Sequence, residues 1–146
     1  MSGVKEGVLL GDVVKKLDEH APLSIAESWD NVGLLLEPSS PHIVKHLFLT
    51  NDLTECVLDE ALDKGVDMIM SYHPPIFASI KRITQNKWKD RLIVKCLENR
   101  VAIYSAHTSY DNVKGNLTLV FKSYSQILSI SRAKDLWGKL LNKMNQ

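Results

Sequence analysis

The chain has 146 residues, of which 45% are apolar and 24% are charged, so it has the size and composition of one ordinary globular domain rather than of a disordered protein. Its formal net charge of +1 provides no overall field that would attract nucleic acid or an anionic membrane, so we expect neither as a direct partner. Its two cysteines, Cys56 and Cys96, are too few for a disulfide framework or a four-thiolate zinc site.

The first twenty residues predict a helix and no targeting segment. Apolar residues recur at helical spacing over residues 9–20, and Pro22 ends that pattern. Acidic residues stand among the lysines here, which is not typical of a secretory signal or of an arginine-rich transit peptide. We therefore expect a cytoplasmic location, with the nucleus as a second compartment.

Four short apolar runs have the length and composition of buried strands: residues 32–36, 46–50, 66–70 and 101–104. Two segments between the later runs have helical periodicity. The first can be capped by Asp52 or Thr54 and ends at Gly65, and the second spans residues 86–99. Strands that alternate with helices are typical of βαβ units. The sequence therefore predicts an α/β fold with a mostly parallel sheet and flanking helices.

The loops that follow three of these strands contain side chains that could bind a metal ion or take part in catalysis. His73 lies in one loop, and His107 and Asp111 lie four residues apart in another. Sites in parallel sheets form beyond the carboxyl ends of the strands, so we expect these loops to meet at one edge. Imidazole and carboxylate groups can bind zinc or another divalent ion, or exchange protons. By spacing alone, ordinary hydrogen-bonded loop residues remain the alternative.

Two further motifs leave alternatives open. Trp29 either packs over the core, with Asp30 and Asn31 capping the turn, or contacts a ligand or a second subunit. The adjacent cations Lys81 and Arg82 either form a solvated surface or hold a phosphate. Glycine is sparse and forms no phosphate-cradling loop, which excludes a nucleotide-binding P-loop.

The last thirty residues have a different composition. Residues 117–146 contain five basic residues and one acidic residue, and apolar residues recur at helical spacing over residues 133–144. We therefore divide the chain into residues 1–116 and a basic amphipathic tail, residues 117–146. The tail either docks on its own domain or binds a membrane surface or a calmodulin-like groove.

Five motifs in order resemble the N-terminal half of the NIF-three-like family (NGG-one-interacting factor three), also known as type-two GTP cyclohydrolase I-like proteins. They occupy residues 27–35, 52–55, 71–77, 81–84 and 104–111. The Tyr-His dipeptide at Tyr72 and His73 is similar to the sequence of animal members at this position. The resemblance implies an α/β domain, a ring-shaped hexamer in bacterial members and a two-metal site. It covers residues up to about 116, so the chain resembles a truncated or alternatively spliced product.

The resemblance also implies roles for single residues. The family's metal ligands are a His-His pair, an aspartate, and a C-terminal histidine and glutamate. The second histidine of the pair falls on His73 and the aspartate on Asp111, whereas the first histidine falls on Tyr72, a poor zinc ligand. His107 matches a family histidine beside the site, so we expect Tyr72 and His107 to support the ligands rather than bind metal.

The C-terminal histidine and glutamate have no counterpart in this sequence. Two ligands rarely hold a metal tightly, because a closed zinc site uses four and a catalytic one three. We therefore expect zinc or another divalent metal to bind weakly or not at all. We assign no catalytic residue.

Two functions from different classes remain open. The first is a truncated family member that self-associates and acts as a transcriptional corepressor-type adaptor with protein partners, because animal members are described in that role in cytoplasm and nucleus. The second is a metal-dependent hydrolase, similar to GTP cyclohydrolase, that acts on a nucleotide or related phosphorylated compound through His73 and Asp111. A third expectation is poor folding, with strands left as bare edges.

Overall fold

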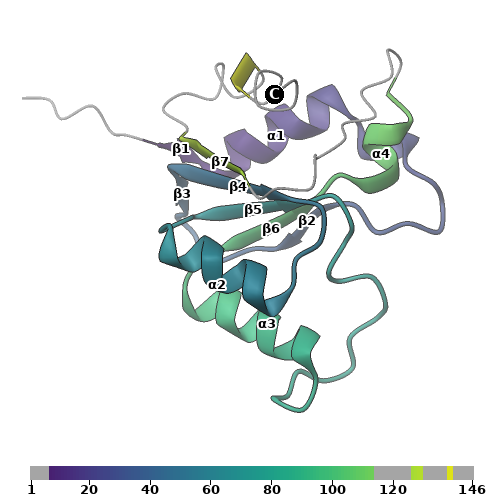
Figure 1. Cartoon of the computed structure of the whole chain (residues 1–146). Coiled ribbons are helices and arrows are strands. Elements are labelled where there is room, and N and C mark those ends of the chain that lie inside the picture. Colours follow the sequence, from purple (N-terminus) through teal and green to yellow (C-terminus); the bar gives the residue numbers. More distant parts are fainter. Residues whose placement is uncertain (1–6, 114–125, 130–137, 140–146) are drawn as a thin grey trace, which may run out of the picture.

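The computed structural model describes residues 7–113, 126–129 and 138–139. A five-stranded sheet forms the centre, with strands in the order β2-β6-β5-β4-β7 and helices on both faces (Figure 1). Its strands are β2 (Gly33–Leu36), β4 (His46–Thr50), β5 (Met68–Ser71), β6 (Ala102–Ser105) and β7 (Gln126–Ser129). A second, two-stranded sheet pairs β1 (Val8–Leu9) with β3 (Ile43–Val44). The α/β fold predicted from the sequence is confirmed.

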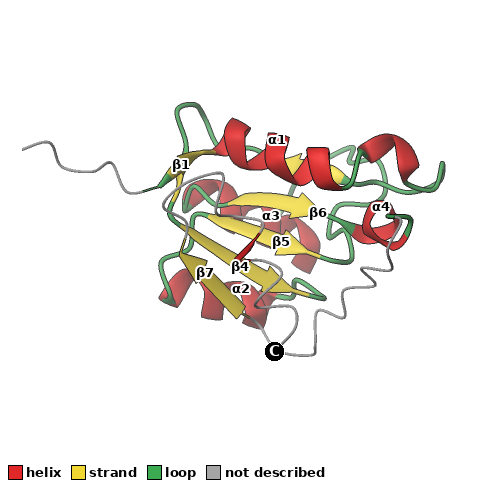
Figure 2. Cartoon of the chain, turned by 90° about the horizontal axis from the view of Figure 1, so that it is seen from above, coloured by secondary structure: helices red, strands yellow, loops and turns green. Residues whose placement is uncertain are grey.

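The helices flank the sheet or follow its edge (Figure 2). They are α1 (Leu10–His20), α2 (Glu55–Asp63), α3 (Trp88–Glu98) and α4 (His107–Asp111), with a short 3-10 turn, η1 (Leu23–Ile25), after α1. Helix α1 lies on one face of the sheet, and α2 and α3 lie side by side on the other. None of the helices in the described ranges is long and apolar enough to cross a bilayer.

Parallel pairing is confined to the three central strands. β4 pairs with β5 and β5 with β6 in parallel, whereas the outer strands β2 and β7 pair antiparallel with β6 and β4. Parallel strands need a crossover between them, and α2 and α3 supply the two crossovers on the same face. The carboxyl ends of β4, β5 and β6 therefore meet at one edge, together with the amino end of β2.

Alternate residues of each central strand face opposite layers. Phe48, Ile69 and Ile103 pack into the cluster under α2 and α3. Their neighbours pack into the cluster under α1: Leu47, Leu49, Met68, Met70, Ala102 and Tyr104. These strands are therefore buried on both faces, which explains why they read as continuous apolar runs rather than as alternating ones.

Helix α2 begins where the sequence offered two caps. The Thr54 hydroxyl accepts a hydrogen bond from the amide of Val57 at 3.3 Å, so Thr54 is the N-cap, and Gly65 follows the helix with a φ of +64°. A positive φ strains residues with a Cβ, which explains glycine at this turn. Asp52, the other candidate cap, is free to reach a different part of the molecule.

Two parts of the chain differ from expectation. The loop expected after the fourth strand contains helix α4, and strand β7 lies within the predicted tail. Lys139 donates a hydrogen bond from its ammonium group to the carbonyl of Ser129 in β7 at 2.8 Å. The helix predicted over residues 133–144 lies outside the described residues except at 138–139, so it stays a prediction, as does the boundary at residue 116.

We expect Ile103→Ala to lower the free energy of unfolding by about 3 kcal/mol, because it opens a cavity at a fully buried position in β6, one of the three central strands. Urea unfolding followed by circular dichroism measures the change. Ile83→Ala is the matched control, since Ile83 is 47% exposed, and it should cost less than about 0.5 kcal/mol. Equal effects of the two variants would contradict this assignment of the core.

Candidate functional site

Polar side chains gather at the edge where the central strands end. Asp52 follows β4, Tyr72 and His73 follow β5, and His107 begins the helix that follows β6. Asp30 comes from the other direction, because β2 runs antiparallel to β6 and its amino end lies at the same edge. Side chains from four separate segments therefore converge, as expected for the carboxyl edge of a parallel sheet.

Hydrogen bonds beyond the strand ends fix the loops at this edge. The amide of His107 donates to the carbonyl of Tyr72 at 3.1 Å, and the hydroxyl of Ser105 donates to the same carbonyl at 3.0 Å. The hydroxyl of Ser71 donates to the carbonyl of His73 at 2.7 Å. Both serines are fully buried, so each hydroxyl satisfies a loop carbonyl where water does not reach.

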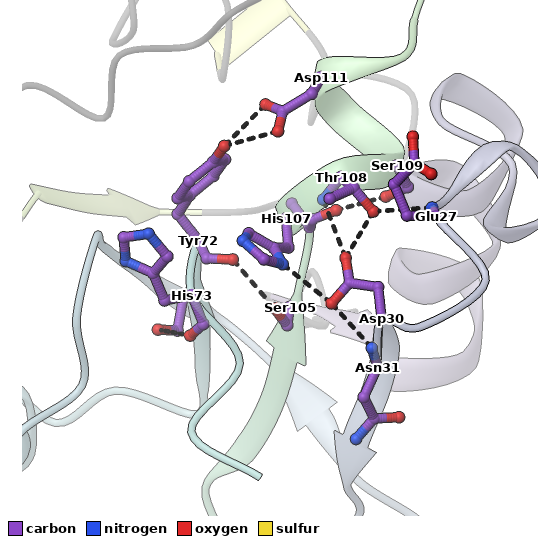
Figure 3. Close-up of polar contacts among 12 residues, drawn as sticks. Glu27, Asp30, Asn31, Tyr72, His73, Ser105, His107, Thr108, Ser109 and Asp111 are labelled. Carbon is purple, nitrogen blue, oxygen red and sulfur yellow. Dashed lines mark hydrogen bonds and ion pairs between the residues drawn. The ribbon is translucent and has the colours of Figure 1, made fainter. Parts of the chain in front are cut away.

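Asp30 and His107 form a buried pair (Figure 3). His107 Nδ1 lies 2.9 Å from Asp30 Oδ1, and the side chains are 18% and 0% exposed. The amide and hydroxyl of Thr108 donate to Asp30 Oδ2, and the amide of Asn31 donates to Oδ1. The carboxylate is thus surrounded by donors.

These donors decide the ionisation of Asp30. Burial alone would raise the pKa of its carboxyl group, but the hydrogen bonds from His107, Thr108 and Asn31 outweigh burial and lower the pKa below the ordinary value of 3.8. Asp30 is therefore ionised at neutral pH. An ionised carboxylate accepts a hydrogen bond from the N–H at Nδ1 of His107, so the other ring nitrogen, Nε2, is not used in this contact.

The backbone at His107 is also unusual. Its φ is +29°, a conformation that residues other than glycine rarely adopt. The amide is held by the carbonyl of Tyr72 and the ring by Asp30, so both ends of the residue are fixed. Such strain persists where surrounding contacts determine the conformation, and it is common at functional sites.

Tyr72 and Asp111 form the second interaction of the site. The tyrosine hydroxyl lies 2.7 Å and 2.8 Å from the two carboxylate oxygens of Asp111 and donates to them (Figure 3). Burial, the hydrogen bond to Asp111 and the negative charges of Asp111 and Asp30 raise the pKa of Tyr72 to about 12. Tyr72 is therefore a protonated donor at neutral pH, and its oxygen is not available as an anionic ligand.

His73 lies at the exposed side of the cluster. Its Nδ1 is 2.9 Å from Asp52 Oδ1, and the two side chains are 52% and 68% exposed, so this pair contributes less than about 1 kcal/mol to stability. The His73 ring centroid lies 4.9 Å from that of Tyr72 and 5.5 Å from that of His107. The four residues selected from the sequence, Tyr72, His73, His107 and Asp111, therefore belong to one cluster joined through Tyr72.

The cluster does not have the geometry of a three-ligand metal site. Among the residues that the structure describes, no three His, Cys, Asp or Glu side chains are arranged to share an ion. His73 is paired with Asp52, and Asp111 is paired with Tyr72. The resemblance assigns two ligands here, His73 and Asp111, which is fewer than a catalytic or closed zinc site uses. Metal binding by His73 and Asp111 stays a prediction.

The acidic partners of both histidines were not predicted from the sequence. Asp52 was one of two candidate helix caps, Asp30 was a candidate turn cap, and Trp29 was expected either to pack over the core or to contact a ligand or a second subunit. The first alternative for Trp29, packing over the core, is wrong: Trp29 is 60% exposed, with its ring centroid 5.9 Å from that of His107 and 6.4 Å from that of Phe77. Asp52 could have been found, because it follows a parallel strand as His73 does. Asp30 required the antiparallel direction of β2.

Comparison with known proteins identifies relatives of most of the chain. The sequence profile of the family described as Duf34/NIF3 (NGG1p interacting factor 3) matches residues 8–134. The human NIF3-like protein 1 is 64% identical over 99 residues, which make up 68% of this chain and 26% of that protein. A Bacillus subtilis protein named GTP cyclohydrolase 1 type 2 homolog is 37% identical over 105 residues, 72% of this chain and 28% of that protein.

Solved structures agree with the sequence matches. A crystal structure of a Bacillus cereus protein related to NIF3 resembles this chain with a TM-score of 0.67 and 33% identity, covering 80% of this chain and 31% of that one. The chain thus corresponds to roughly a quarter to a third of the length of these relatives.

We expect Asp30→Asn to lower the free energy of unfolding at pH 7 by about 1–3 kcal/mol, because the amide presents N–H groups where the carboxylate accepted hydrogen bonds. Asp52→Asn is the matched control at the exposed pair and should cost less than about 1 kcal/mol. Urea unfolding of the three proteins measures both changes.

The same series has a pH dependence. Because the pKa of Asp30 is lower in the folded chain, its stabilisation is complete above the unfolded value of 3.8 and is lost as pH falls through the lowered value. The difference between the parent and Asp30→Asn should therefore shrink below about pH 4. A difference that stays constant from pH 7 to pH 3 would contradict the assignment of an ionised Asp30.

Proposed function

The chain belongs to the Duf34/NIF3 family, and from this membership and the geometry of its site we propose that it is an interaction protein of the transcriptional corepressor-adaptor type rather than an enzyme. We propose that it acts in the cytoplasm and nucleus. The observation that carries the proposal is the pairing within the site: its candidate metal ligands are hydrogen-bonded to neighbouring side chains.

Each candidate ligand has a competing partner. A cation at Asp111 would have to replace the hydroxyl of Tyr72, which donates to both carboxylate oxygens. A cation at Nδ1 of His73 would have to replace Asp52. Because only two protein ligands would offset these losses, we propose that zinc or another divalent metal binds weakly or not at all.

Exposed aromatic side chains beside the site support an interaction role. Trp29 and Phe77 are both at least half exposed, and their ring centroids are 6.4 Å apart. The side-chain amide of Asn31 donates to the carbonyl of Ile76 at 2.7 Å, which holds the two segments together. Large aromatic residues are enriched in protein interfaces, so this pair fits contact with a partner protein or with a second copy of the chain.

A second candidate function is metal-dependent hydrolysis of a nucleotide or related phosphorylated compound. It is favoured by the name of the Bacillus subtilis relative, GTP cyclohydrolase 1 type 2 homolog. A bound divalent metal would supply Lewis acidity and an activated water. In this function His73 and Asp111 would have to hold the metal, which requires both to leave their present partners.

Metal content distinguishes the two functions. After equilibration with zinc and dialysis, we expect the purified chain to hold well below one zinc per molecule by elemental analysis. Tyr72→His should raise the zinc content, because it places a second imidazole next to His73 and releases Asp111. Tyr72→His combined with His73→Ala is the matched control and should lose that gain.

The opposite result would support the hydrolase. Stoichiometric zinc in the parent chain that His73→Ala removes, together with turnover of GTP, would establish the hydrolase and overturn the adaptor.

A further inference from the structure

A surface groove with a cavity volume of about 380 Å³ is lined by residues of the loop after β5 and of helix α3. Figure 1 shows the course of this loop from the end of β5 to the start of α3. Its apolar lining includes Phe77, Ile80 and Ile93. Phe77 and Ile80 are about half exposed, although large apolar side chains are costly to leave in water. The volume is within the range of small-ligand pockets and would accept one or two large apolar side chains.

The groove is held open by hydrogen bonds at both ends of the loop. The amide of Thr84 donates to the buried carboxylate of Asp90 at 3.2 Å, which ties the end of the loop to α3. The carbonyl of Ile76 accepts a hydrogen bond from Asn31 at the edge of the sheet. A pre-formed groove binds at a lower entropic cost than one that must order first.

Positive charge surrounds the apolar lining. Lys81, Arg82, Lys87 and Lys89 line the groove, and the acid that lines it, Asp90, is buried and bound to the loop. Across the described part of the chain, no salt bridge involves any of these four cations.

Some basic residues elsewhere pair with acidic side chains. Lys95, two turns further along α3, pairs with Asp59, and Lys64 pairs with Glu60 on α2. The groove therefore combines exposed apolar surface with four cations that form no salt bridge within the described residues. A ligand that supplied both apolar groups and carboxylates would complement it.

We propose that this groove binds an acidic segment of a partner protein, in which carboxylates flank one or two large apolar side chains. In this proposal the apolar side chains contact Phe77 and Ile80, and the carboxylates pair with the lining cations Lys81, Arg82 and Lys87. The predominantly apolar lining favours such a segment over a bare phosphate. The inference rests on the proposed interaction role and names the chemistry of the partner.

The probe is a short fluorescein-labelled peptide in which leucine and phenylalanine alternate with glutamate. Fluorescence anisotropy in the presence of EDTA measures its binding to the full chain, so that the result does not depend on metal. Two control peptides separate the contributions: one replaces glutamate by lysine, and the other replaces leucine and phenylalanine by alanine. We expect both controls to bind at least about tenfold more weakly.

Two pairs of charge reversals locate the site. The double variant Lys81→Glu/Arg82→Glu should weaken peptide binding by at least about tenfold. The control, Lys15→Glu/Lys45→Glu, changes the net charge by the same amount at exposed positions outside the groove. It should weaken binding by less than about threefold. Ile80→Ser should weaken binding without any change of charge. Circular dichroism and thermal melting show whether each variant remains folded.

Equal loss in both charge-reversal pairs would show a non-specific charge effect and overturn the proposal. So would displacement of the peptide by GTP, which would assign the groove to a nucleotide, or burial of the groove in a dimer that Ile80→Ser dissociates by light scattering. If the peptide does not bind and the chain holds less than one zinc per molecule, this inference is overturned and the proposed function stands. If the chain holds stoichiometric zinc and turns over GTP, the proposed function is overturned.

Discussion

The carboxylate of Asp30 connects the parts of the site. It is buried, and it accepts hydrogen bonds from the ring of His107, from the backbone and hydroxyl of Thr108, and from the amide of Asn31. One acidic group thereby fixes the start of β2, the start of α4 and the orientation of an imidazole. A buried carboxylate is stable only when donors surround it, so these segments depend on one another.

Tyr72 stands where the family resemblance implies a histidine, and tyrosine has a different chemistry from histidine. A neutral imidazole offers a lone pair to a cation, whereas a phenol with a pKa near 12 offers a proton. That proton is directed at Asp111, which the resemblance designates as a ligand. The polar side chains at this sheet edge are thus hydrogen-bonded to one another. The exposed surface beside them, which includes Phe77, is more accessible for recognition.

The sequence predicted the central layer well because parallel strands buried on both faces leave continuous apolar runs. It also predicted that His73 and His107 would lie together, since both follow strands of the same direction. It could not predict their partners, because the position of Asp30 depends on β2 entering the sheet antiparallel, which its short apolar run does not indicate. Helix α4 was missed for a similar reason: its five residues are too short to show a helical period.

The two strands that are outermost among the described residues limit how copies of the chain can join. β2 and β7 have four residues each, and the ammonium group of Lys139 covers a carbonyl of β7. Short strands and lysine side chains at a sheet margin discourage the addition of a further strand. Assembly by continuing the backbone ladder from one molecule into the next is therefore unfavourable. Contacts between molecules would instead be made through side chains, where single substitutions can tune them.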